Sequence, residues 1–146
     1  MKEIWFDMDG TIADLYSVPH WLKSLESFDP APYQIAKPLL NFSLLARLLN
    51  KLQRKGYKIG IVTWTSKNAP TNYNQAVEDA KRWWLKKHLP SVHFDEIIVT
   101  EYGVAKEITC SYSTGILFDD NAEIRKTWAG TAYDQNSIIA ILKSLA

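Results

Sequence analysis

Short apolar runs alternate with amphipathic stretches along most of this chain. The run from residue 4 to residue 6 ("IWF") is continuous, β-prone and followed directly by Asp7, a pattern typical of a strand buried on both faces. The same signal returns four times, at residues 57–64 ("YKIGIVTW"), 94–100 ("FDEIIVT"), 115–120 ("GILFDD") and 131–133. We therefore expect five strands, spread over nearly the whole chain.

Amphipathic segments separate these strands. After the N-cap residue Asn41, leucines recur at helical spacing from Leu45 to Leu52, and Gly56 ends the segment. A second helix is predicted at residues 72–89, and a last one carries the apolar residues between positions 138 and 145. Strands that alternate with helices predict an α/β fold with a central parallel sheet covered on both faces.

Residues 13–41 interrupt this alternation. Four prolines punctuate the segment, which holds a single short apolar helix candidate at residues 20–28. We expect an insert here rather than part of the core. No linker or repeat divides the rest, so the sequence predicts one domain over residues 1–146.

Composition and charge narrow the function classes. The 146 residues are 47% hydrophobic and 23% charged, as in ordinary globular proteins, and a net charge of +1 provides no bulk attraction to nucleic acid or an anionic membrane. The single cysteine, Cys110, excludes an internal disulfide. No apolar run reaches the ~18 residues of a membrane span, and the amino terminus lacks a signal-peptide core. We expect a cytoplasmic protein.

Polar residues with chemical potential follow the predicted strands. Because the carboxyl ends of parallel strands share one edge of the sheet, these residues are expected to converge. They are Asp7 and Asp9 after the first strand, Thr63, Trp64 and Thr65 at the end of the second, Lys106 after the third, and Asp119 and Asp120 after the fourth. So many carboxylates cannot all be ionised without a counter-charge, and a hard cation such as Mg²⁺ answers that need.

The order of these motifs resembles the haloacid dehalogenase (HAD) superfamily. "DMDGT" follows an apolar strand, a threonine closes the second strand, a lysine comes later, and "LFDD" closes the fourth. The resemblance implies a three-layer, Rossmann-like (HAD-like) domain with a minimal cap insert at about residues 13–41. It also implies a Mg²⁺-dependent phosphatase that acts on a small phosphorylated substrate.

The resemblance assigns roles to the aspartates. Asp7 would be the nucleophile that forms an aspartyl-phosphate, and Asp9 would be the general acid and then the base for water. The metal would be held by the side chains of Asp7 and Asp119 and by the backbone carbonyl of Asp9, with Asp120 or Asn121 acting directly or through water.

Other residues would contact the phosphoryl group. A hydroxyl of the second strand, from Thr63 in preference to Thr65, would bind it, and Lys106 would offset its charge. We also expect Gly10 and Thr11 of the first motif to lie against the substrate. A surface lysine at a helix start is the competing interpretation of Lys106.

The substrate prediction depends on aromatic residues. Trp21 in the insert and Trp64 beside the predicted phosphate site are placed to stack a nucleobase. "DMDGTIAD" in particular resembles the small 5'(3')-deoxyribonucleotidase branch, which implies a nucleotide 5'-monophosphate as substrate. We expect the remaining tryptophans to pack in the core, and these include Trp5, Trp83, Trp84 and Trp128.

Several other interpretations remain open. Asp119 and Asp120 could cap a helix that begins near Asn121. A calcium loop starting at Asp7 fits poorly, because its glycine comes fourth rather than sixth. Sugar phosphates, nucleic-acid ends and a non-catalytic regulatory role are alternative functions. We do not expect nucleic acid, because the basic segment at residues 81–88 ("KRWWLKKH") suits a solvated helix face over a buried tryptophan stripe.

Overall fold

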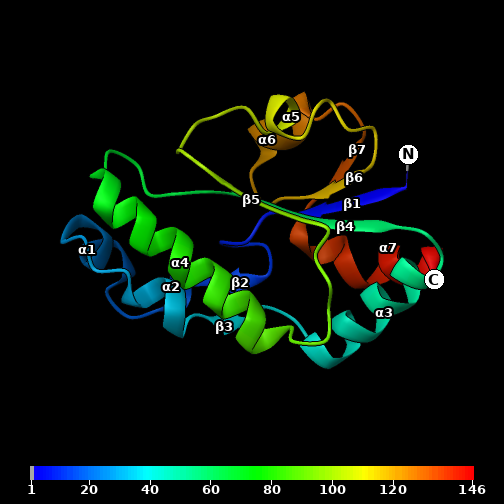
Figure 1. Ribbon diagram of the computed structural model, residues 1–146, viewed down its shortest axis with the longest axis horizontal. Coiled ribbons are helices and arrows are strands. Elements are labelled where there is room, and N and C mark those ends of the chain that lie inside the picture. The colour runs from blue at the N-terminus through cyan, green and yellow to red at the C-terminus, as the bar shows by residue number, and fades with distance from the viewer. Residues whose placement is uncertain (1) are drawn as a thin grey trace.

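The computed structural model describes residues 2–146 and contains one five-stranded parallel sheet (Figure 1). Its strands lie in the order β5-β4-β1-β6-β7, all parallel to their neighbours. They are β1 (Glu3–Phe6), β4 (Lys58–Trp64), β5 (Glu96–Thr100), β6 (Ile116–Phe118) and β7 (Thr131–Tyr133). The α/β fold with a central parallel sheet is confirmed.

Helices cover both faces of the sheet, as Figure 1 shows. One face carries α3 (Phe42–Arg54), α4 (Thr71–His88) and α7 (Ile138–Leu145), which follows the short η2 (Gln135–Ser137). The other face carries the shorter helices α5 (Lys106–Thr109) and α6 (Ala122–Thr127). The long helices predicted from apolar spacing are present within a residue or two of their expected bounds.

Alternation along β1 explains how both faces are buried. Ile4 and Phe6 point into the cluster formed with α3, α4 and α7, whereas Trp5 packs on the opposite face against Cys110 and Trp128. Trp5 also requires a glycine on the neighbouring strand. It lies beside Gly60 in the β1–β4 register, and a Cβ on Gly60 would come within 2.5 Å of the indole ring. Any other residue at position 60 would therefore displace Trp5.

The segment between β1 and α3 is more structured than its prolines suggest. It contains β2 (Ala13–Asp14), η1 (Leu15–Ser17), α1 (Trp21–Glu26), α2 (Ala31–Ile35) and β3 (Lys37–Pro38), and β2 pairs antiparallel with β3. The expectation of a single helix was wrong. Pro30 and Pro32 lie at the start of α2, where the first backbone N–H groups have no partner within the helix, so proline costs little there.

Helix α4 connects this segment to the core, and α1 and α2 lie beside it in Figure 1. The indole N–H of Trp84 donates to the carbonyl of Ala36 at 2.7 Å, and the Tyr73 hydroxyl donates to the carbonyl of Asp29 at 3.2 Å. Trp84 is fully buried. The segment is therefore anchored through hydrogen bonds as well as through apolar contact.

The prediction for the tryptophans was correct at Trp5, Trp84 and Trp128, which are all buried, and wrong at Trp83. Trp83 is 47% exposed, with Lys87 lying over its ring. Successive helix positions point about 100° apart, and the buried side of α4 includes Trp84 and Leu85 but not position 83.

No helix within residues 2–146 is both long enough and apolar enough to cross a membrane.

The adjacent tryptophans of α4 provide a matched stability test. Trp84→Phe should lower the free energy of unfolding by about 2 to 3 kcal/mol, because it removes buried volume and leaves the Ala36 carbonyl without its donor. Trp83→Phe should change it by less than about 0.5 kcal/mol. Urea unfolding followed by circular dichroism measures both. Equal losses would show that Trp84 does not anchor the segment.

Candidate active site

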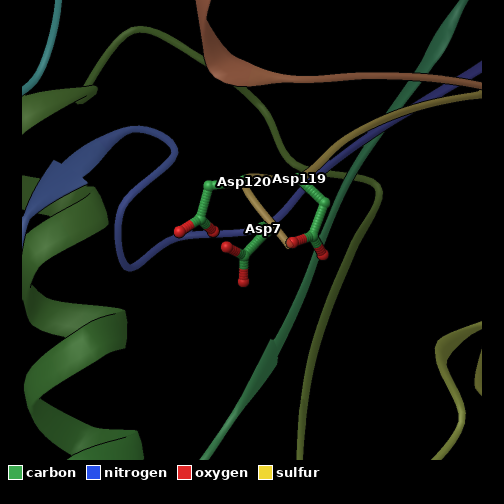
Figure 2. A group of neighbouring side chains, drawn as sticks. All are labelled: Asp7, Asp119 and Asp120. Atoms are coloured by element: carbon green, nitrogen blue, oxygen red, sulfur yellow. The ribbon is translucent and has the colours of Figure 1, made fainter. Parts of the chain in front are cut away.

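Three aspartates converge where β1 and β6 end. Asp7 follows β1, and Asp119 and Asp120 follow β6, the neighbouring strand. Figure 2 shows their carboxylates turned toward one another, and one oxygen of each lies within 4.8 Å of the others. Asp7 and Asp119 are buried and Asp120 is partly exposed. These are hard oxygen donors in the arrangement that suits a divalent cation such as Mg²⁺.

Lys106 lies against two of these carboxylates. Its ammonium is 2.9 Å from Oδ1 of Asp7 and 2.8 Å from Oδ2 of Asp119, and only 2% of the residue is exposed. The interpretation of Lys106 as a surface lysine was therefore wrong. Lys106 is the first residue of α5, which covers the face of the sheet opposite α4, and its side chain reaches the cluster from that face.

The electrostatics of the cluster follow from burial and these contacts. Burial alone would raise the pKa of Asp7, but the attraction of Lys106 outweighs it and leaves the pKa below its ordinary value. Burial, together with the charge of Asp7, raises the pKa of Asp119 to about 6 and that of Asp120 to about 7. Asp7 is therefore the carboxylate that stays ionised most readily.

The loop after β1 brings Asp120 close to Asp7. The Thr11 hydroxyl donates to Oδ2 of Asp7 at 2.9 Å and accepts from the backbone N–H of Asp120 at 3.1 Å. Gly10 has a φ of +78°, and a Cβ there would lie 2.4 Å from Oδ2 of Asp120. Glycine is thus required both by the backbone conformation and by the close approach.

The structure places Gly10 and Thr11 in the tight loop after β1. Their backbone N–H groups donate within the loop, to the carbonyls of Ala13 and Met8, and neither residue lines the cavity described below. Thr11 is 1% exposed. Both residues shape the loop that holds Asp7 and Asp120.

Sequence reasoning missed Lys81 of α4. It is 1% exposed, and its ammonium donates to Oδ2 of Asp9 at 2.9 Å, to Oγ1 of Thr63 at 2.7 Å and to the carbonyl of Trp64 at 2.7 Å. The interpretation of residues 81–88 as a solvated face was wrong at this position. A signal was available, because Lys81 lies four residues after Val77 and three before Trp84, on the apolar stripe itself.

A cavity of about 560 Å³ opens above the carboxylates. Asp7, Asp9, Thr63 and Lys106 line its floor together with Asp119 and Asp120. Six aromatic residues contribute to its walls, and they are Tyr16, Trp21, Phe28, Tyr33, Trp64 and Tyr102. The structure thus brings the predicted Trp21 and Trp64 to the same cavity as the predicted carboxylates.

The two candidate hydroxyls, Thr63 in β4 and Thr65 directly after it, differ in their surroundings. Thr63 accepts a hydrogen bond from Lys81, whereas Oγ1 of Thr65 is buried and has no hydrogen-bond partner among residues 2–146. Both residues line the cavity. An unpaired buried hydroxyl is costly, so Thr65 is suited to a ligand that supplies the missing partner.

The helix-cap interpretation of the aspartate pair was wrong. Asn121 is the N-cap of α6, and its side chain accepts from the backbone N–H of Glu123 at 2.9 Å. Asp119 and Asp120 therefore do not cap α6, and their carboxylates lie in the cluster with Asp7.

Comparisons with known proteins support the fold. No protein-family model and no curated protein matches the sequence. A crystal structure of a D,D-heptose 1,7-bisphosphate phosphatase from Burkholderia thailandensis superposes with a TM-score of 0.58 at 12% identity, covering 99% of this chain and 97% of that one. The same enzyme from B. bronchiseptica, complexed with magnesium and phosphate, gives 0.56 at 18% identity, covering 97% and 87%. At these identities the similarity is one of fold.

The raised pKa of Asp120 predicts a pH-dependent effect on stability. A carboxyl whose pKa lies above its ordinary 3.8 makes the folded state lose stability as the pH rises through about 7. In EDTA, Asp120→Asn should therefore raise the free energy of unfolding by about 1 kcal/mol at pH 8 and by less at pH 5, where Asp120 is still protonated in the folded protein but already ionised in the unfolded chain.

Urea unfolding at the two pH values measures this effect. Glu101→Gln, which removes an exposed negative charge, is the control and should have little effect at either pH. A variant no more stable than the wild type at pH 8 would contradict the description of Asp120 as electrostatically crowded.

Proposed function

We propose that this protein is a Mg²⁺-dependent phosphohydrolase of the HAD type, which cleaves a small phosphomonoester through an aspartyl-phosphate. The observation that carries the proposal is the contact between Asp7 and Lys106 at the floor of a cavity, beside two further carboxylates. The proposed nucleophile Asp7, the ammonium of Lys106 and the proposed metal ligands then lie around a space that would accept one phosphoryl group. Both Asp7 and Asp9 of the motif are present, which argues against a purely regulatory domain.

Asp7 has the properties of the nucleophile. Its lowered pKa keeps it ionised at neutral pH, and Lys106 and Thr11 fix the direction of its carboxylate. Attack on phosphorus forms the Asp7–phosphoryl bond and breaks the bond to the leaving oxygen, so one difficult displacement becomes two easier ones. Lys106 also offsets negative charge on the phosphoryl oxygens.

The three-carboxylate cluster fits a bound Mg²⁺. Asp7, Asp119 and Asp120 would hold the ion, since hard oxygen donors within 4.8 Å of one another match its preference. When bound, the ion withdraws charge from the phosphoryl oxygens and so allows a carboxylate to approach them. Ionisation of all three aspartates is then favourable.

Asp9 is suited to proton transfer. Its side chain is 20% exposed and lines the cavity. Burial raises its pKa above the ordinary value, although Lys81 opposes this, so a protonated fraction persists closer to neutral pH. We assign to Asp9 donation of a proton to the leaving oxygen, followed by removal of a proton from the water that hydrolyses the phosphoenzyme.

Two hydroxyls are available for the phosphoryl oxygens. Thr63 accepts from Lys81 and keeps its own proton to donate, and Thr65 offers a hydroxyl with no partner in the described chain. We propose that both contact the phosphoryl group. The sequence favoured Thr63 over Thr65 as the phosphoryl-binding hydroxyl, and we now propose that role for both.

The substrate is inferred from the walls of the cavity. The segment at residues 13–41, which we propose is the cap, contributes Trp21. The end of β4 contributes Trp64, and the loop after β5 contributes Tyr102. Aromatic walls suit a flat group, so a nucleoside 5'-monophosphate is our leading candidate. A sugar phosphate is the second candidate, because the fold neighbours are phosphatases of a heptose bisphosphate.

The mechanism predicts the effect of Asp7→Asn. The amide cannot form the phosphoenzyme, so phosphate release from p-nitrophenyl phosphate should fall by roughly a thousandfold or more. EDTA should abolish wild-type release, and added Mg²⁺ should restore it. Asp79→Asn, at a surface carboxylate of α4 that accepts from Gln75, is the control and should keep full activity. Full activity in a folded Asp7→Asn protein would eliminate the phosphoenzyme mechanism.

The substrate proposal is tested at Trp64. Trp64→Ala should raise the KM for a nucleoside 5'-monophosphate roughly tenfold, because stacking is lost, and should change the KM for ribose 5-phosphate far less. Trp64→Phe keeps an aromatic face and serves as the matched control. Equal changes for the two substrates would argue against base stacking and for the sugar-phosphate alternative.

A further inference from the structure

We propose that Lys81 is the positioning residue for Asp9, and that it fixes the Asp9 carboxylate in the orientation from which a proton reaches the leaving oxygen. This inference rests on the proposed function, because it assigns a role within the same site. Its basis is the contact geometry of the buried Lys81 ammonium.

The three donors of that ammonium meet three acceptors. They are Oδ2 of Asp9 at 2.9 Å, Oγ1 of Thr63 at 2.7 Å and the carbonyl of Trp64 at 2.7 Å. An ammonium has three N–H bonds, so this set satisfies it fully. The Lys81 head group is therefore held rigidly at one place.

Lys81 joins three segments that are separate in the sequence. It comes from α4, whereas Asp9 lies in the loop after β1, and Thr63 and Trp64 end β4. Its ammonium also lies 5.2 Å from the centre of the Tyr33 ring, which belongs to the proposed cap. The position of the Asp9 carboxylate is thus set by the packing of α4 and not by its own loop alone.

The hydrogen bond to Lys81 leaves Asp9 one oxygen for chemistry. Oδ2 of Asp9 is occupied by Lys81, and the partly exposed side chain lines the cavity, so Oδ1 is the oxygen available to the leaving group. General acid catalysis requires the proton within hydrogen-bond reach of that group. Without Lys81, the carboxylate would be free to rotate and would lose that alignment.

Each of the two reactive carboxylates, Asp7 and Asp9, contacts a different buried lysine. Lys106 binds Asp7 and Asp119, while Lys81 binds Asp9 at a separate point on the cavity floor. Loss of Lys81 should therefore impair proton donation while leaving the nucleophile and its cation in place. That distinction can be measured with substrates that differ in their need for an acid.

The test compares two esters in the Mg²⁺-loaded enzyme. p-Nitrophenyl phosphate has a good leaving group that needs little protonation, whereas a simple alkyl phosphate depends on it. Lys81→Met should lower kcat/KM for the alkyl ester by roughly ten- to a hundredfold more than for the aryl ester. Asp9→Asn should show the same selective loss, and adding Lys81→Met to Asp9→Asn should enlarge it little. Lys86→Met, at an exposed site on α4, is the control.

The outcomes separate this inference from the function on which it rests. Equal losses for both esters in Lys81→Met, with an active wild type, would overturn the role of Lys81 and leave the phosphohydrolase intact. A selective loss that simply multiplies with that of Asp9→Asn would also overturn it. Failure of the wild type to release phosphate from either ester would overturn the function and this inference together.

A second variant covers the case in which Lys81→Met does not fold. Lys81→Gln keeps a hydrogen-bond donor without the charge and should retain part of the alkyl-ester activity that Lys81→Met loses. If neither variant gives a cooperative thermal transition, Lys81 is a structural residue and the proposal is wrong.

Discussion

The crowding of three carboxylates at one buried corner is the constraint on which the rest of the site depends. Asp7, Asp119 and Asp120 lie within one ligand sphere, where like charges cannot all persist without a cation. Lys106 supplies one positive charge and stabilises Asp7 most strongly. Burial, together with the charge of Asp7, leaves Asp119 and Asp120 with raised pKa values, which a bound divalent ion would lower. The arrangement of the three carboxylates therefore supports the magnesium site that we propose.

The parallel sheet makes this corner possible. Strands β1, β4 and β6 are neighbours and end at the same edge, so loops from distant parts of the chain meet there. Helices from both faces then direct a lysine toward that edge: α5 provides Lys106 and α4 provides Lys81. Each lysine is almost fully buried, and the carboxylates that it contacts offset the cost of burying its charge.

The same helix connects the chemistry to the proposed cap. Trp84 of α4 bonds the Ala36 carbonyl, and Lys81, one turn earlier, holds Asp9 and lies near the ring of Tyr33. The wall of the cavity and the orientation of Asp9 are thus set by one rigid element. Substitutions in α4 that shift it are expected to disturb both together.

Local sequence determined much of this protein. Buried strands, the leucine stripe of α3 and the residues directly after each strand could be predicted, because apolar periodicity and strand ends are local signals. Only the tertiary structure determined the hydrogen-bond partners of Lys81 and Lys106 and the different surroundings of Thr63 and Thr65. Lys81 and Lys86 lie in the same basic run. The apolar stripe of α4 indicates that Lys81 faces inward, but only the tertiary structure shows that Asp9 and Thr63 are its partners. Such pairings join residues far apart in the chain, and periodicity carries no information about them.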